Sequence, residues 1–255
     1  MSQPRGVTLP LSLPRRLICD LLHFAQQIPS IPVQRRMHLG PVVAARQAAS
    51  PRPSWTAIFT KAYGFVTAAY PELRRAYLSF PWPRLYEHPV NVAMLAVERD
   101  FRDERAVLFA HVQEPEKRAL PEIDTKLRRY KEAPLASIGT FRRLMLVGRL
   151  PRPLRRLLWW YGLSASGRMR VRFFGTFGVT TYGGLGASSL HPRGVLTTTL
   201  NYGPIDPDGG VDVRIVYDHR VLDGRTIAHA LADLERVLKH EIVAELGYYR
   251  ALDAA

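Results

Sequence analysis

The stretch YDHRVLDGRTIAHALADL, residues 217–234, joins a predicted strand to a predicted helix. On the strand side, apolar residues occupy every second position, as in a half-buried strand, at Val211, Val213, Ile215 and Tyr217. On the helix side, apolar residues recur at helical spacing, at Ile227, Leu231, Leu234 and Leu238. Between them lie His219 and the pair Asp223-Gly224, where Gly224 supplies the backbone freedom that such a turn often needs. If strand geometry continues to His219, its ring points towards the covered side of the sheet.

Position alone leaves two interpretations for each polar residue of this turn. His219 is either an interior histidine with satisfied hydrogen bonds or a neutral imidazole that takes a proton near neutral pH. Asp223 is either the N-cap of the following helix or a carboxylate that fixes the loop or pairs with an arginine.

The remaining sequence predicts one mixed α/β domain over residues 1–255. Helices are expected over residues 14–27, 54–70, 120–132 and 227–238. Further strands are expected over residues 90–97, 105–112, 175–181 and 195–200. Prolines make residues 28–40 extended and turning. Three segments stand apart, namely an extended N-terminal arm (1–12), a basic aromatic insertion (141–172) and a C-terminal extension (241–255).

Composition and charge narrow the classes of partner. The 255 residues carry a formal net charge of +14, which attracts nucleic acid, an anionic membrane or a phosphate-bearing cofactor. The arginines are scattered and no nucleic-acid-binding motif accompanies them, so we expect no nucleic-acid partner. Cys19, the single cysteine, lies in an apolar stretch and is expected to be a buried, inert thiol. No signal peptide and no run of about 18 apolar residues is found, which favours a cytoplasmic location.

The basic aromatic insertion combines arginines with an apolar helical face formed by Leu154, Leu157, Leu158 and Tyr161. Such a face suits peripheral contact with an anionic membrane, or the wall of a pocket for an apolar substrate that includes Trp159 and Trp160. The alternative is a helix packed on its own domain with a solvated basic rim.

The motif DHRVLDG (218–224) resembles the H-x-x-x-D-G signature of the chloramphenicol acetyltransferase-like superfamily, and most closely the catalytic domain of dihydrolipoamide acyltransferases. Further stretches resemble that domain in the same order, namely PLSLPRRLICDLL, FTKAYGFVTAAYPEL, GTFGVTTYGGLGA, SLHPRGVLTTTLNYG and DPDGG. The resemblance implies a two-layer α/β sandwich around a mixed sheet. It also implies homotrimers with active sites between subunits.

The resemblance assigns roles to individual residues. His219 matches the general base, and Asp223 matches the aspartate that holds the site's geometry through an arginine, for which Arg15 and Arg16 are the candidates. Thr180 matches the hydroxyl that donates to the oxyanion of the tetrahedral intermediate. From the residues alone, Thr180 reads as an ordinary β-branched strand residue.

The implied reaction is direct acyl transfer from a coenzyme A or carrier-protein thioester, with no covalent acyl-enzyme. Coenzyme A offers phosphates to the basic charge, and Arg193 and Lys61 are the candidate contacts. The candidate substrate pocket contains Trp159, Trp160 and Tyr182. We expect no metal, because the histidines lack zinc-ligand spacing, and no serine hydrolase, because G-x-S-x-G is absent from the sequence.

The sequence also departs from the acyltransferase pattern. It contains no lipoyl or subunit-binding domain, its insertion is longer, and its C-terminal extension passes the tail through which dihydrolipoamide cores build cubes. We therefore expect a free-standing trimer acting on a small or lipid-like acceptor. Two alternatives remain, namely a catalytically degenerate scaffold or ligand-binding protein of the same fold, and a core subunit of a 2-oxoacid dehydrogenase-like complex.

Overall fold

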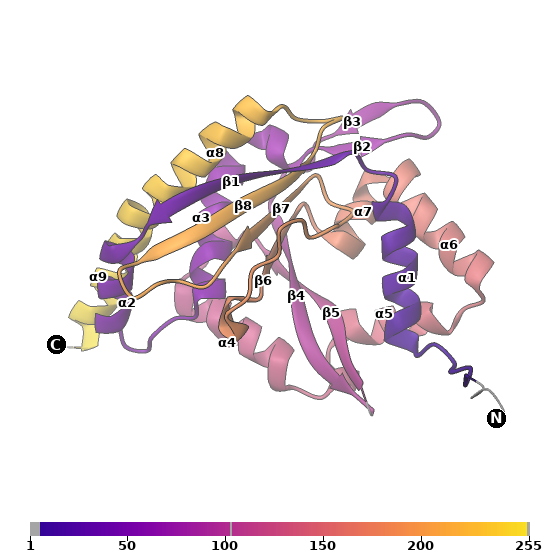
Figure 1. The fold of residues 1–255 in the computed structure, drawn as a ribbon, viewed down its shortest axis with the longest axis horizontal. Coiled ribbons are helices and arrows are strands. Elements are labelled where there is room, and N and C mark those ends of the chain that lie inside the picture. The colour runs from indigo at the N-terminus through magenta and orange to yellow at the C-terminus, as the bar shows by residue number, and fades with distance from the viewer. Residues whose placement is uncertain (1–5, 103, 254–255) are drawn as a thin grey trace, which may run out of the picture.

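One mixed sheet organises the chain in a computed structural model that describes residues 6–102 and 104–253 (Figure 1). Its strand order is β1-β8-β7-β6-β4-β5, in which β7–β6 and β6–β4 are parallel and the other neighbours antiparallel. The strands are β1 (Ser30–His38), β4 (Val92–Phe101), β5 (Glu104–Gln113), β6 (Phe177–Thr181), β7 (Thr198–Tyr202) and β8 (Gly210–Asp218). A separate hairpin pairs β2 (Ala76–Leu78) with β3 (Arg84–Tyr86). The predicted fold class, a mixed sheet layered with helices, is confirmed.

One face of the sheet is covered by a helical layer. The helices are α2 (Gly40–Ala48), α3 (Trp55–Ala69), α4 (Leu120–Glu132), α8 (Gly224–Val237) and α9 (Val243–Asp253). Ser54 caps α3 as predicted, because its hydroxyl accepts the amide of Ala57 at 3.1 Å. The alternating residues of β8 join the main core with Phe59 and Tyr63 of α3. Burial of this apolar layer is the main stabilising contribution to the fold.

The other helices gather beside β5, at the opposite side of the molecule from α9 in Figure 1. They are α1 (Leu13–Ala25), α5 (Gly139–Arg149), α6 (Arg152–Trp160) and α7 (Gly167–Phe174). A second apolar cluster, including Leu21, Trp159 and Phe174, holds α1, α6 and α7 together. Buried Asp20 accepts the guanidinium of buried Arg155 at 2.5 Å, which fixes α6 to α1.

The insertion keeps the predicted apolar face on its outer side. Leu154, Leu157, Leu158 and Tyr161 are all about half exposed, whereas Trp159 is buried. None of the helices in the described residues is both long and apolar enough to cross a bilayer.

Residues 30–38 are extended, as expected, and they form an edge strand that includes Pro32, since an edge position tolerates a proline that cannot donate to a ladder. One local expectation was wrong. Cys19 is exposed rather than buried, because α1 turns Leu17 and Leu21 inward and leaves Cys19 on its outer side.

The N-terminal arm and the C-terminal extension differ in secondary structure and in burial. Residues 6–12 of the N-terminal arm have no regular secondary structure, and residues 1–5 of that arm lie outside the described residues. In the C-terminal extension, Ile242 and Leu246 are buried in the main core of the same chain. Residues 254–255 of that extension lie outside the described part.

Candidate active site

The histidine turn begins where β8 ends. The Nδ1 atom of His219 lies 2.9 Å from the carbonyl oxygen of Leu222. A carbonyl oxygen only accepts, so Nδ1 carries the proton of the neutral ring and Nε2 keeps its lone pair. The backbone amide of His219 donates to the carbonyl of Pro29, which holds the turn against the start of β1. This turn therefore presents a histidine of defined tautomer.

The ring of His219 does not lie on the covered side of the sheet as expected. Its side chain is 45% exposed. Its ring lies edge to face with the ring of Tyr217, and the two ring centroids are 5.6 Å apart. The alternation of β8 stops at Asp218, whose carbonyl accepts the amide of Val221 and starts a turn. The strand period thus ends one residue before the histidine.

A buried charge cluster supports this turn from below. Asp218 is buried and accepts two hydrogen bonds from the guanidinium of Arg220, which stacks over Tyr77. Arg170, also buried, donates to the carbonyl oxygen of Val195 at 2.7 Å. Burial lowers the pKa of Arg170 to about 10, and the charge of Asp218 acts in the opposite direction. Arg170 therefore remains a cation near neutral pH.

Asp223 occupies the N-cap position of α8, but its side chain makes no capping hydrogen bond. Its carboxylate is 86% exposed and lies 3.7 Å from Nδ1 of His219, which is an electrostatic contact rather than a hydrogen bond. Within the chain, the two candidate arginines lie elsewhere. Arg16 donates to the carbonyl of Leu11, and Arg15 lines a groove described below.

Gly224 is not needed for conformational freedom. It is the first residue of α8, and a Cβ atom there would meet only the hydroxyl of Tyr217, at an ordinary 3.5 Å. The left-handed glycines described in this chain are Gly175, Gly186 and Gly209. The turn after His219 is therefore built without a special glycine geometry.

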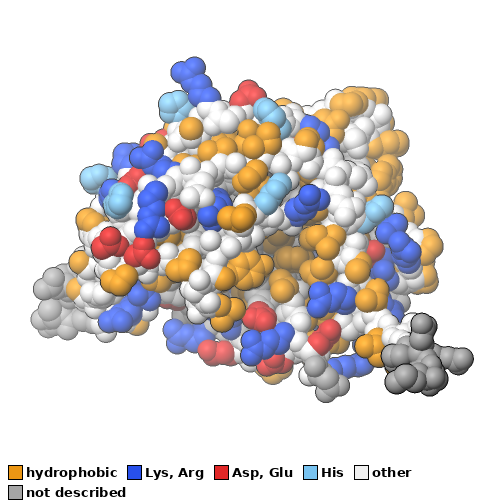
Figure 2. All heavy atoms as spheres, viewed as in Figure 1, with side chains coloured by type: hydrophobic (Ala, Val, Ile, Leu, Met, Phe, Trp, Pro, Cys, Tyr) orange, Lys and Arg blue, Asp and Glu red, His pale blue; other side chains and the backbone are white. Residues whose placement is uncertain are grey.

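Thr180 lies in a different place, a groove of about 300 Å³ between α1 and the open face of the sheet. Figure 2 shows the hollow in this face, bordered largely by hydrophobic side chains. The groove also contains Arg15, Tyr182 and Arg193, so four of the predicted site residues come together here. Gly178 helps to keep it open, because a Cβ atom there would come within 3.0 Å of the Thr199 hydroxyl.

Strand register separates Thr180 from His219 within one chain. Thr180 pairs with Asn201 of β7, which in turn pairs with Arg214 of β8. His219 follows Arg214 by five residues, which is about 17 Å along the strand, and β8 is two strands away from β6. A histidine base and an oxyanion donor must both lie within about 3 Å of the reacting atoms. One chain alone does not bring these two side chains together.

The other predicted residues are divided between the core and the insertion. Lys61 is buried, donates to the carbonyl of Arg118 at 2.7 Å and pairs with Glu245 at 2.5 Å, so its charge is satisfied internally. Trp159 lines a second, smaller pocket, whereas the ring of Trp160 packs against Phe80. Among the described residues, no group of three His, Cys, Asp or Glu side chains is placed to hold a metal ion.

Sequence reasoning missed the wall that β5 gives to the groove. Arg105, Val107 and Phe109 line it with exposed or partly exposed side chains, while Leu108 is buried and Ala106 is buried but also borders the groove. Their period of two was available as a signal. What the sequence lacked was the position of α1, which turns this face of β5 into the wall of a groove.

Comparisons with known proteins identify the fold. No protein-family model matches the chain, and a search of curated proteins finds no significant match. The structure is similar to that of the dihydrolipoamide acetyltransferase of Azotobacter vinelandii. That structure was used to study how a serine, a histidine and an asparagine act in catalysis. The sequences are 14% identical, with a TM-score of 0.69 over 95% of this chain and 94% of that chain.

Two further structures agree with this similarity. A probable dihydrolipoamide acetyltransferase of Listeria monocytogenes is 17% identical, with a TM-score of 0.66 over 92% of this chain and 94% of that chain. Chloramphenicol acetyltransferase is 12% identical, with a TM-score of 0.53 over 88% of this chain and 95% of that chain. The chain therefore has the chloramphenicol acetyltransferase-like fold.

Proposed function

We propose that the protein is an acyltransferase that moves an acyl group directly from a thioester of coenzyme A, or of a carrier protein, to a small or lipid-like acceptor. The observation that carries the proposal is the tautomer of His219, whose Nδ1–H is engaged by Leu222 while Nε2 keeps its lone pair at a half-exposed position. The shared fold supports the same reaction class, since the similar Azotobacter enzyme is an acetyltransferase for which a histidine's catalytic role was studied.

In the proposed reaction, Nε2 of His219 removes the proton of the acceptor as its hydroxyl, thiol or amine attacks the thioester carbonyl. The carbonyl electrons move onto oxygen, and the Thr180 hydroxyl donates a hydrogen bond to that oxyanion. Collapse of the tetrahedral intermediate breaks the carbon–sulfur bond, and the imidazolium returns its proton to the leaving thiolate. Asp223, 3.7 Å from Nδ1, stabilises the imidazolium electrostatically.

We infer that the complete site forms between subunits of a homotrimer. The separation of Thr180 and His219 by strand register supports this arrangement, because a neighbouring subunit can bring its histidine turn to the groove. The exposed carboxylate of Asp223 would then find an arginine across the interface, with Arg15 as the candidate since it lines the groove.

A free-standing trimer, rather than a subunit of a large complex, is the favoured assembly. The C-terminal extension supports this preference, because Ile242 and Leu246 are buried in their own chain and Glu245 pairs with Lys61. In the groove, Arg193 is the proposed contact for the phosphates of a coenzyme A donor. The exposed leucines of α6, together with exposed Arg152, support an apolar acceptor, drawn from solution or from an anionic membrane surface.

The test is a screen of acyl-coenzyme A donors of increasing chain length for release of free thiol, with candidate acceptors pooled. We expect acceptor-dependent thiol release that saturates with donor and is unaffected by a chelator. If no donor is cleaved while the protein binds acyl-coenzyme A tightly, the degenerate ligand-binding alternative replaces the acyltransferase.

A further inference from the structure

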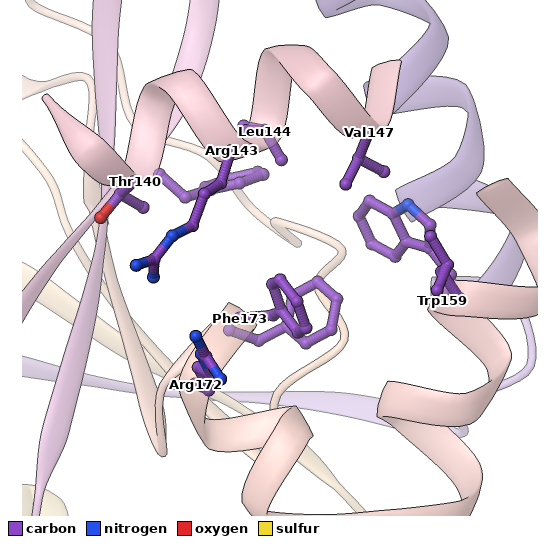
Figure 3. Close-up of a pocket in the computed structure, with 10 residues that line it drawn as sticks. Thr140, Arg143, Leu144, Val147, Trp159, Arg172 and Phe173 are labelled. Atoms are coloured by element: carbon purple, nitrogen blue, oxygen red, sulfur yellow. The ribbon is translucent and has the colours of Figure 1, made fainter. Parts of the chain in front are cut away.

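A second pocket lies within the basic aromatic insertion, enclosed by α5, α6, α7 and β5. It has a volume of about 80 Å³, and most of its lining is apolar. The apolar walls are Phe109, Leu144, Val147, Leu158, Trp159 and Phe174, with Phe173 beside them. Figure 3 shows Val147 and Trp159 on one side of the pocket. This end of the pocket suits a short apolar segment and offers it little opportunity to hydrogen-bond.

Two arginines face the same pocket from different helices. Arg143 extends from α5 and Arg172 from α7, and Figure 3 shows both side chains on the side of the pocket opposite Trp159. Both residues are exposed. An anion bound at this end of the pocket can accept charge-assisted hydrogen bonds from both guanidinium groups.

The local sequence supplies no carboxylate to separate them. The chain has nine arginines between residues 139 and 174, and no aspartate or glutamate between Glu132 and Asp206. Asp20 of α1 reaches the insertion, but it is engaged by Arg155 and lies 3.8 Å from Arg156. Among the ion pairs of the described residues, neither Arg143 nor Arg172 takes part. Both guanidinium groups are therefore open to an external anion.

We propose that this pocket binds an amphiphilic anion, with a short segment of its apolar chain between Val147 and Trp159 and its anionic group held by Arg143 and Arg172. Guanidinium groups bind phosphate and carboxylate in forked, charge-assisted geometry, which suits an alkyl phosphate or a fatty carboxylate. The site stands apart from the proposed catalytic groove, and its existence does not depend on acyl transfer. Phe109 lines both, so a bound chain contacts one wall of the Thr180 groove.

The test is calorimetric titration of the full chain with octyl phosphate below its micelle concentration, compared with octanol and inorganic phosphate. We expect octyl phosphate to bind at least about tenfold more tightly than either. Octanol lacks the anionic group that the arginines would bind, and inorganic phosphate lacks the apolar chain. Octanoate should bind in the same place if the carboxylate geometry is also accepted. Equal affinity for octyl phosphate and octanol would remove the role of the arginines.

Variants separate this pocket from the general basic surface. The double change Arg143→Gln with Arg172→Gln should weaken octyl phosphate binding about tenfold or more. The matched control is Arg142→Gln with Arg149→Gln, which removes two exposed arginines of α5 that do not line the pocket and should leave affinity within about twofold. Val147→Phe fills the apolar end and should block binding while the melting temperature stays near that of the wild type. Equal losses in the two arginine pairs would overturn the proposal in favour of non-specific charge attraction.

Discussion

His219 donates its Nδ1 proton to the carbonyl oxygen of Leu222, three residues ahead in the same turn, at 2.9 Å. The base and the group that sets its tautomer therefore belong to one short loop. The hydrogen bond that orients the ring does not involve α1, the helix that borders the groove. In the proposed trimer, each subunit would therefore present this histidine, with its tautomer already set, to the groove of a neighbouring subunit.

Replacing His219 with alanine should lower acyl transfer by about 10²–10⁴-fold, because the general base is lost. The side chain is 45% exposed, so the melting temperature and the oligomeric state should not change. His229→Ala is the matched control, since this exposed histidine lies one and a half turns into α8. Steady-state thiol release measures both variants. Full turnover by the His219 variant would remove the proposed mechanism.

Replacing Thr180 with valine should lower kcat by about 10²-fold or more, because the oxyanion loses a donor. Valine keeps the branched shape, so KM for the donor should change little. Thr180→Ser retains the hydroxyl and should keep most of the activity. The comparison is made with the best donor from the screen. A serine variant as inactive as the valine variant would indicate a packing role instead.

Mixing the two inactive variants tests the position of the active site. In a trimer whose site takes His219 from one subunit and Thr180 from the next, random reassembly of equal amounts restores about a quarter of the sites. The subunits are unfolded together, refolded and assayed beside each variant refolded alone. If both residues served the same subunit, the mixture would stay as inactive as its components.

Asp20→Ala should destabilise the fold by about 3–5 kcal/mol, because it leaves the buried guanidinium of Arg155 without its carboxylate. Urea unfolding gives the free energy. The control is Arg35→Ala, which removes a half-exposed arginine from Glu235 while that carboxylate keeps its pair with Lys239, and it should cost about 1 kcal/mol or less. A small effect of Asp20→Ala would mean that water reaches Arg155 when the partner is removed.

His111 should make the protein less stable in mild acid. Burial, together with the charge of Lys126, lowers the pKa of His111 to about 4 from the usual 6.5. Between these values the unfolded chain binds a proton that the folded chain does not, so stability falls as pH is lowered through this window. The loss from this residue approaches roughly 3 kcal/mol at the acid end.

The change His111→Leu isolates that contribution. The buried Nε2 atom of His111 has no hydrogen-bond partner among the described residues, so leucine should cost little near pH 7. The difference in unfolding free energy between variant and wild type should grow in favour of the variant between pH 6.5 and pH 4. A constant difference across this range would contradict the assigned pKa.

Much of the fold was predictable because local patterns decided it. The period of two in β8, the Ser54 cap of α3 and the helical spacing in α8 each reflect contacts within a few residues, and all three were found. The extended conformation around Pro32 was predictable, but its pairing as a strand was not, because a proline is tolerated in a strand mainly where that strand lies at an edge. Edge position is a property of the whole sheet.

For the candidate site, too, local contacts were predictable from the sequence and contacts between distant elements were not. The sequence by itself determined the residues of the histidine turn, because His219 and Leu222 interact across three positions of one loop. Only the tertiary structure decided that Thr180, Arg15, Tyr182 and Arg193 share a groove and that Lys61 does not, because packing of α1 over the sheet and of α9 under it sets those neighbours. The register of β6, β7 and β8 places Thr180 far from His219. This separation depends on how the strands pair, which the spacing of residues along the sequence does not specify.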